Sequence, residues 1–172
     1  MAWMGGVAAC ASRAPMSAVG VSNGGALESH AAPSVAARVP SPIPVDFRAT
    51  LTKVNRQRFN AGGHAGGRFD ADVYVTPSAK DAAFGILPAP PGLGGGIPPT
   101  PPGTVLVMEE VELGKSTAGP VLMMEKEAPG FDSARGDWRY VVVDGTDVQD
   151  GALDLCASCH AEAPHDHVFA VD

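Results

Sequence analysis

Two cysteines and a histidine, with the types and spacing of a cofactor site, lie near the end of the chain in "LDLCASCHAEAPHDH" (residues 153–167). Cys156 and Cys159 are separated by two residues, and His160 follows directly. Cys-x-x-Cys-His is the attachment signature of c-type haem, in which both thiols bond to the porphyrin and the histidine ligates the iron. The motif therefore predicts a covalently attached haem c, with His160 as the proximal iron ligand.

Three other chemistries use a cysteine pair with this spacing. A zinc site would combine Cys156 and Cys159 with two of the histidines His160, His165 and His167. A thioredoxin-like dithiol needs a βαβ context, which the segments before the pair do not supply. A disulfide between the two cysteines is the third alternative, and it is compatible with an exported protein. The specificity of the motif favours haem, and these alternatives stay open.

The segments before the cysteine motif are mainly strand-like. In "RFDADVYVT" (residues 68–76), the residues Phe69, Ala71, Val73 and Val75 alternate with polar neighbours, which predicts a half-buried strand. Three further strand-like runs follow, over residues 104–113, 120–127 and 137–144. A weaker strand candidate, residues 47–54, precedes residues 68–76. The long segments of 3.6-residue period that a four-helix cytochrome would need are absent.

Two short helices and an extended tail complete the expected fold. Residues 76–84 predict a helix with Thr76 as its N-cap and Pro77 at its first position. Residues 147–160 predict a short helix that carries the cysteines, and residues 165–171 predict an extended tail. The fold class is therefore mainly β with short helices (α+β), an antiparallel sheet domain carrying a C-terminal haem-attachment helix.

Composition separates this domain from the rest of the chain. The 172 residues include 21 glycines and 16 prolines, and the formal net charge of −7 gives no support for a nucleic-acid partner. The sequence has no apolar run of about 18 residues, the length of a transmembrane helix. We expect a linker over residues 10–45, a haem c domain over residues 46–172, and a Pro/Gly-rich loop within it over residues 85–103.

The start of the chain predicts export. Cys10 follows Val7-Ala8-Ala9, which resembles the lipobox of bacterial lipoproteins, and residues 1–9 are too short for a complete signal peptide. We therefore expect residues 1–9 to be a truncated signal-like segment, with a true start further upstream. The expected location is the periplasm or cell envelope, with a membrane tether through lipidated Cys10. A free cysteine in a disordered leader is the alternative.

Three segments in order carry a family resemblance: "GTVLVMEEVEL", "GPVLMMEKEAPGFDSARGDWRYVVVDG" and "CASCHAEAPHDHVF". Together they resemble the cytochrome P-460 and cytochrome c′-beta family over roughly residues 47–172. The resemblance implies a β-rich homodimer with a five-coordinate haem c and an open distal side. Members of the family either oxidise hydroxylamine or bind nitric oxide and similar gases.

One position separates these two activities in the family. Hydroxylamine-oxidising members carry a lysine that cross-links to the haem, whereas Met108 occupies that position in "GTVLVMEE". A thioether cannot form the lysine-type bond, so Met108 disfavours hydroxylamine oxidation. We expect Met108 to line the distal pocket; packing in the core and ligation of the iron are its alternatives. Lys126 lies on another strand and is expected to be a solvated residue.

Further candidates for the distal pocket come from other segments. His64 lies among glycines that allow close approach to a flat cofactor; a flexible surface loop that happens to carry a histidine is its alternative. Arg68 is a candidate partner for a haem propionate or a distal anion. Glu109 and Glu125 are candidates for a carboxylate that handles protons over the haem; the alternative for either is a solvent-facing strand residue, which is the more frequent case.

Three more side chains are placed by pattern alone. Trp138 is expected in the core near the haem edge. His165 and His167 flank Asp166, so on an extended tail they would point to the same side.

The sequence thus predicts an exported c-type haem protein that binds or redox-processes a small nitrogen-oxide ligand such as nitric oxide. The alternative is an electron-transfer cytochrome with His160 and Met108 as axial ligands and a redox partner protein. Hydroxylamine oxidation is the third and least favoured activity.

Overall fold

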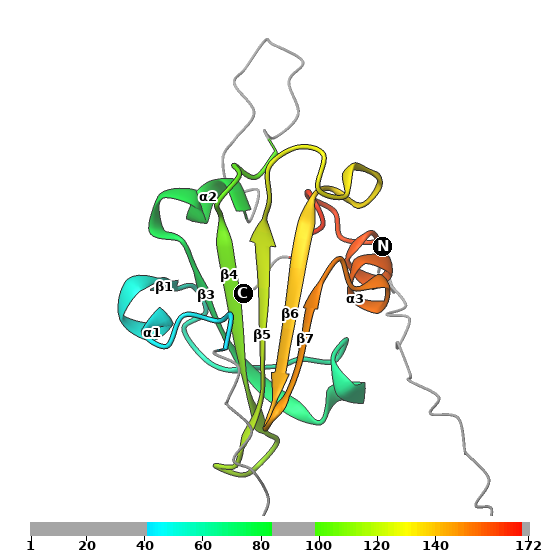
Figure 1. The fold of residues 1–172 in the computed structure, drawn as a ribbon. Helices are drawn as coiled ribbons and strands as arrows, with labels where there is room; N and C mark the ends of the chain where they lie inside the picture. The colour runs from blue at the N-terminus through cyan, green and yellow to red at the C-terminus, as the bar shows by residue number, and fades with distance from the viewer. Residues whose placement is uncertain (1–40, 84–98, 170–172) are drawn as a thin grey trace, which may run out of the picture.

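A computed structural model describes residues 41–83 and 99–169 (Figure 1). Cys10, the signal-like segment, nearly all of the expected linker and most of the Pro/Gly-rich loop lie outside the described residues. The helices and strands are α1 (Phe47–Thr50), β1 (Thr52–Lys53), β2 (Phe59–Asn60), β3 (Phe69–Val75), α2 (Lys80–Ala83), β4 (Val105–Glu112), β5 (Ala118–Lys126), β6 (Trp138–Asp144), β7 (Asp147–Gly151) and α3 (Asp154–His160). Short 3₁₀ turns cover Ala65–Gly67, Pro77–Ala79 and Ser133–Arg135.

The described strands form one antiparallel sheet with the order β1-β3-β4-β5-β6-β7, and β2 pairs with the beginning of β3. The long strands β4, β5 and β6 lie at its centre (Figure 1). Each of them comes from one of the strand-like runs of the sequence. The predicted fold class, mainly β with a C-terminal helix that carries the cysteine motif, is confirmed.

Each face of the sheet packs against a different helix. On one face, α1 contributes Phe47 to a cluster with Tyr74, Val107 and Val141. Ile43 belongs to the same cluster and is 5% exposed, so the end of the expected linker is part of the domain. The prediction that β3 is half-buried is wrong for its second half, because this cluster covers the face that was expected to meet solvent.

The other face of the sheet receives α3. Ala157 of α3 packs with Leu106, Trp138 and Tyr140, all of them buried. The expected core position of Trp138 is confirmed, since its side chain is fully buried. Adjacent strand residues point to opposite faces, so the even-numbered residues of β4, β5 and β6 face α3. The cysteine motif on α3 therefore lies against this face of the sheet.

Three local expectations differ from the structure. The weak strand candidate is one helical turn, α1, followed by the two-residue strand β1. The helix expected over residues 147–160 begins only at Asp154, because residues 147–151 pair with β6 as β7 after a tight turn with Gly145 at φ 59°. Thr76 precedes its 3₁₀ turn without capping it; its hydroxyl accepts a hydrogen bond from Val105 N instead.

Within the described residues, no helix combines the length and the hydrophobicity needed to cross a membrane.

Candidate functional site

Helix α3 places the cysteine motif against the sheet. Its first turn holds Asp154, which suits the positive end of the helix dipole and forms an ion pair with Arg135. Ala157 is the fully buried contact with the sheet. Cys156 and Cys159 are three residues apart and therefore lie on one side of the helix. Both are half-buried thiols in the structure, and burial raises the pKa of Cys156.

A cavity of about 710 Å³ opens in front of these thiols. Its volume falls in the range of about 300–1,000 Å³ that is usual for small-molecule and cofactor sites. Most of the lining is apolar, with a few polar groups. Among the residues that face it are Cys156, Cys159, His160, Met108, Leu122, Met124, Tyr140 and His64. The structure thus brings the cysteine motif, Met108 and His64 to one cavity.

The ring of His160 is oriented by the chain that follows it. Its Nδ1 lies 2.8 Å from the carbonyl oxygen of His167. Because a carbonyl only accepts hydrogen bonds, Nδ1 carries the proton, which leaves the lone pair of the neutral ring on Nε2. Burial lowers the pKa of His160 and so favours this neutral form. A backbone carbonyl on the second ring nitrogen is the usual support of a metal-ligating histidine.

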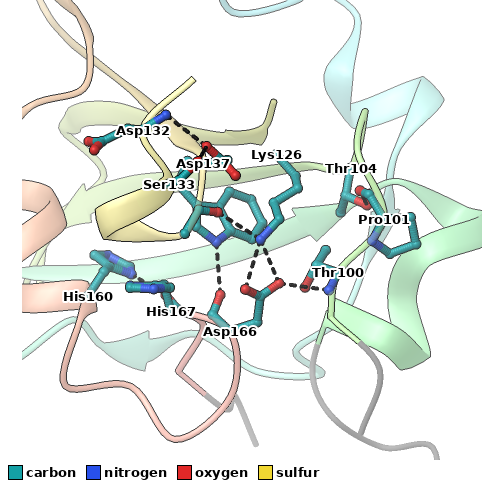
Figure 2. A network of polar contacts seen from close by, with 12 residues as sticks. Thr100, Pro101, Thr104, Lys126, Asp132, Ser133, Asp137, His160, Asp166 and His167 are labelled. Atoms are coloured by element: carbon teal, nitrogen blue, oxygen red, sulfur yellow. Dashed lines mark hydrogen bonds and ion pairs between the residues drawn. The ribbon is translucent and has the colours of Figure 1, made fainter. Parts of the chain in front are cut away.

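The segment that supplies this carbonyl is anchored by a buried ion pair. Lys126 Nζ lies 2.8 and 2.9 Å from the two carboxylate oxygens of Asp166, and it donates a hydrogen bond to Gly136 O at 2.8 Å (Figure 2). Trp138 Nε1 donates to Asp166 O at 2.9 Å, and Thr100 N donates to the Asp166 carboxylate at 2.7 Å. The prediction that Lys126 is solvated is wrong, because the residue is only 8% exposed.

The tail that contains Asp166 is a turn and not the extended segment expected from the sequence. Asp166 and His167 have φ of 41° and 65°, so the chain turns where an extended segment was expected. His165 and His167 are therefore not alternating residues of a strand. Their predicted common orientation is wrong, because it depended on that strand. The turn directs the carbonyl of His167 to His160 (Figure 2).

The close approach of the His167 ring to the backbone at position 136 requires a glycine there. The φ of Gly136 is 76°, and a Cβ at this position would lie 2.4 Å from Cδ2 of His167. We expect Gly136→Ala to displace His167 and to lower the free energy of unfolding by about 1–3 kcal/mol, the usual cost of overpacking. The matched control is Gly145→Ala, because Gly145 also has a positive φ but has no atom within 4 Å of the added Cβ.

Urea unfolding of both variants, compared with the wild type, measures this difference. A Gly136→Ala variant no less stable than Gly145→Ala would show that the ring of His167 is not held against the backbone here.

Opposite α3, three side chains form a polar group on the cavity wall. His64 Nδ1 lies 3.1 Å from Met108 Sδ and 3.2 Å from Glu110 Oε1. Arg68 lines the cavity as an exposed residue, so it is available at the rim to pair with an acidic group of a bound cofactor. Met108 therefore lines the cavity, as the first of its predicted roles requires.

The two carboxylates proposed from the sequence do not line the cavity, and that prediction is wrong for both. Glu109 lies on the opposite face, where it pairs with Arg48, whose Nε is 2.9 Å from Glu109 Oε2. Glu125 is bound by Arg139 at 3.1 Å. Sequence reasoning missed Glu110, although strand alternation signals it, since Glu110 lies two residues beyond Met108.

The hydroxyl of Tyr140 is an unsatisfied polar atom at this site. It is buried and has no hydrogen-bond partner among the described residues, and burial raises its pKa. The Tyr140 ring lies 5.6 Å from that of His160, measured between centroids. A buried hydroxyl ordinarily has a partner, so this atom fits a cavity that receives a polar group of a bound molecule.

The zinc alternative requires a cluster of ligands around the thiols. Among residues 41–83 and 99–169, no group of three or more histidine, cysteine, aspartate and glutamate side chains is arranged to hold a metal ion. One oriented histidine and two thiols that face a large, mostly apolar cavity also fit the donor set of a c-type haem.

Comparison of the chain with protein-family models and with curated proteins gives no match.

Proposed function

We propose that this chain is an exported c-type haem protein of the cytochrome P-460 and c′-beta type, which binds nitric oxide or a related small nitrogen-oxide ligand. One observation carries the proposal: the cavity has both thiols and the oriented His160 on one wall, and His64, Met108 and Glu110 opposite. A flat cofactor attached to α3 would have its proximal side at His160 and its distal side at this polar group.

Each residue of the motif has a separate role in this proposal. Cys156 and Cys159 hold the cofactor through thioether bonds, and His160 ligates the iron through Nε2 while His167 O fixes its ring. Arg68 at the rim pairs with a propionate. A bound haem c supplies an iron atom that takes a small ligand and changes oxidation state.

The distal side favours ligand binding over hydroxylamine oxidation. No lysine of the described residues lines the cavity, and the amine of Lys126 is bound to Asp166. The alternative electron carrier with Met108 as an axial ligand has less support, because Met108 Sδ accepts a hydrogen bond from His64. A homodimer, a redox partner protein and a lipid tether at Cys10 belong to the proposal on sequence grounds alone.

Absorption spectra of the full chain, matured in a host that attaches haem c, test this function. We expect the Soret band of the reduced protein to shift when nitric oxide or carbon monoxide is added. A haem protein whose spectrum stays unchanged at saturating gas would contradict ligand binding and would support electron transfer.

A further inference from the structure

We infer that His64 is the second axial ligand of the iron, facing His160, and that a gas binds by displacing it. This inference rests on the proposed haem site and adds a regulatory step to it. The family resemblance implies a five-coordinate iron, so the expectation for this chain departs from that of the family.

The spacing of the two histidine rings supports the inference. The centroids of His64 and His160 are 6.3 Å apart, and the ring planes differ by 35°. A metal–nitrogen bond of about 2 Å on each side, together with the distance from each nitrogen to its ring centre, separates two opposed imidazole ligands by about 6–7 Å. The two rings therefore stand at the separation that one shared iron requires.

The hydrogen bonds of His64 Nδ1 determine that Nε2 is the ring nitrogen that can bind a metal. Met108 Sδ has no proton to donate, so the contact of 3.1 Å to His64 Nδ1 requires the proton on Nδ1. The neutral ring then carries its lone pair on Nε2, as His160 does. Both rings therefore use Nδ1 for a protein acceptor and keep Nε2 for a metal, which is the arrangement of ligating histidines.

Glu110 stabilises this orientation of the His64 ring. Its side chain is 1% exposed, and among the described residues the one hydrogen bond shown for its carboxylate is accepted from His64 Nδ1. A buried carboxyl group needs such a partner. Glu110 is therefore a positioning residue for His64, comparable to the carboxylates that support histidine ligands in metal sites.

The backbone around His64 has a defined conformation, and its glycines allow it to rearrange. His64 N donates to Ala61 O at 2.8 Å and Gly67 N donates to His64 O at 2.9 Å, so the backbone has a defined conformation. Glycines at positions 62, 63, 66 and 67 lower the barrier to its rearrangement. A gas competes with such a ligand, and its apparent affinity falls by the fraction of molecules in which the iron site is open.

Spectra and carbon monoxide titration of the matured full chain test the inference. We expect six-coordinate low-spin iron in the wild type without gas, by absorption and electron paramagnetic resonance. His64→Ala should give five-coordinate high-spin iron and bind carbon monoxide about 10- to 100-fold more tightly, if the open form has about 1–10% population in the wild type. Added imidazole should restore the low-spin spectrum of His64→Ala.

Met108→Leu tests the other candidate ligand on the same wall; it removes one acceptor of His64 Nδ1 and leaves Glu110 as the acceptor that holds the ring. It should keep the low-spin spectrum. A five-coordinate wild type would overturn the inference while leaving the haem site intact. A low-spin spectrum that survives His64→Ala and disappears in Met108→Leu would assign the ligand to Met108. A chain without bound haem would overturn both the inference and the proposed function.

Discussion

The variant Cys156→Ala/Cys159→Ala is expected to lose all covalently bound haem. Each thiol supplies one thioether bond in the proposed site, and no other residue of α3 can replace it. Alanine is the best helix former, so α3 itself should persist in the variant. Haem staining after denaturing electrophoresis should change from a strong band in the wild type to none.

The third cysteine offers a control for this result. Cys10→Ala should keep the haem band at wild-type intensity, since Cys10 lies outside the motif. A haem band that survives denaturation in the double variant would place the attachment elsewhere and contradict the roles given to Cys156 and Cys159.

Lys126→Met is expected to cause the largest loss of stability. The side chains of Lys126 and Asp166 are 10% and 13% exposed, so the substitution leaves a nearly buried carboxylate without its cation. Removing one partner of a buried pair costs about 3–5 kcal/mol, a large part of the total stability of about 5–15 kcal/mol of a typical domain. Urea unfolding of the matured protein measures the loss.

The double variant Lys126→Met/Asp166→Asn distinguishes a missing partner from a missing contact. Because it leaves no unpaired buried charge, its loss should be smaller than that of Lys126→Met by about 2 kcal/mol. If both variants lose the same free energy of unfolding, then Lys126 stabilises the tail by packing alone.

The same pair predicts a dependence on acid. Burial alone would raise the pKa of Asp166, but hydrogen bonds from Lys126 and Thr100 outweigh it and hold the pKa below its ordinary value. The unfolded chain therefore binds this proton more readily, and stability rises with pH across the window between the two pKa values. The contribution is complete above the ordinary pKa of about 4 and is lost as the pH falls through the lowered value. The difference in free energy of unfolding between the wild type and the double variant should therefore decrease as the pH falls through this window.

The sequence predicts the long strands β3, β4, β5 and β6 well from their apolar runs and alternation, whereas the short strand β2 is not predicted and β7 was expected to be helical. Residues 104–113, 120–127 and 137–144 contain β4, β5 and β6 almost without change. Alternation also specifies which face of the sheet each side chain meets. Once Met108 is placed toward the cofactor, Glu109 must point away and Glu110 must follow Met108.

The tail could not be predicted in this way. Its turn depends on Lys126 and Asp166, which are 40 residues apart and share no local pattern. A lysine in a polar-looking segment is usually solvated, and only the folded sheet shows that Lys126 faces α3. The approach of His64 to His160 is equally non-local, since it requires β4 and α3 to lie across one cavity.

The intact mass of the native full-length chain is a sharp test of haem attachment at Cys156 and Cys159. We expect denatured protein to retain the added mass of one haem, with the increment located by fragmentation on the peptide that contains Cys156 and Cys159. A mass lower by two hydrogen atoms would instead show a disulfide. An unmodified chain, from a host that attaches haem c to other proteins, would contradict haem attachment at Cys156 and Cys159.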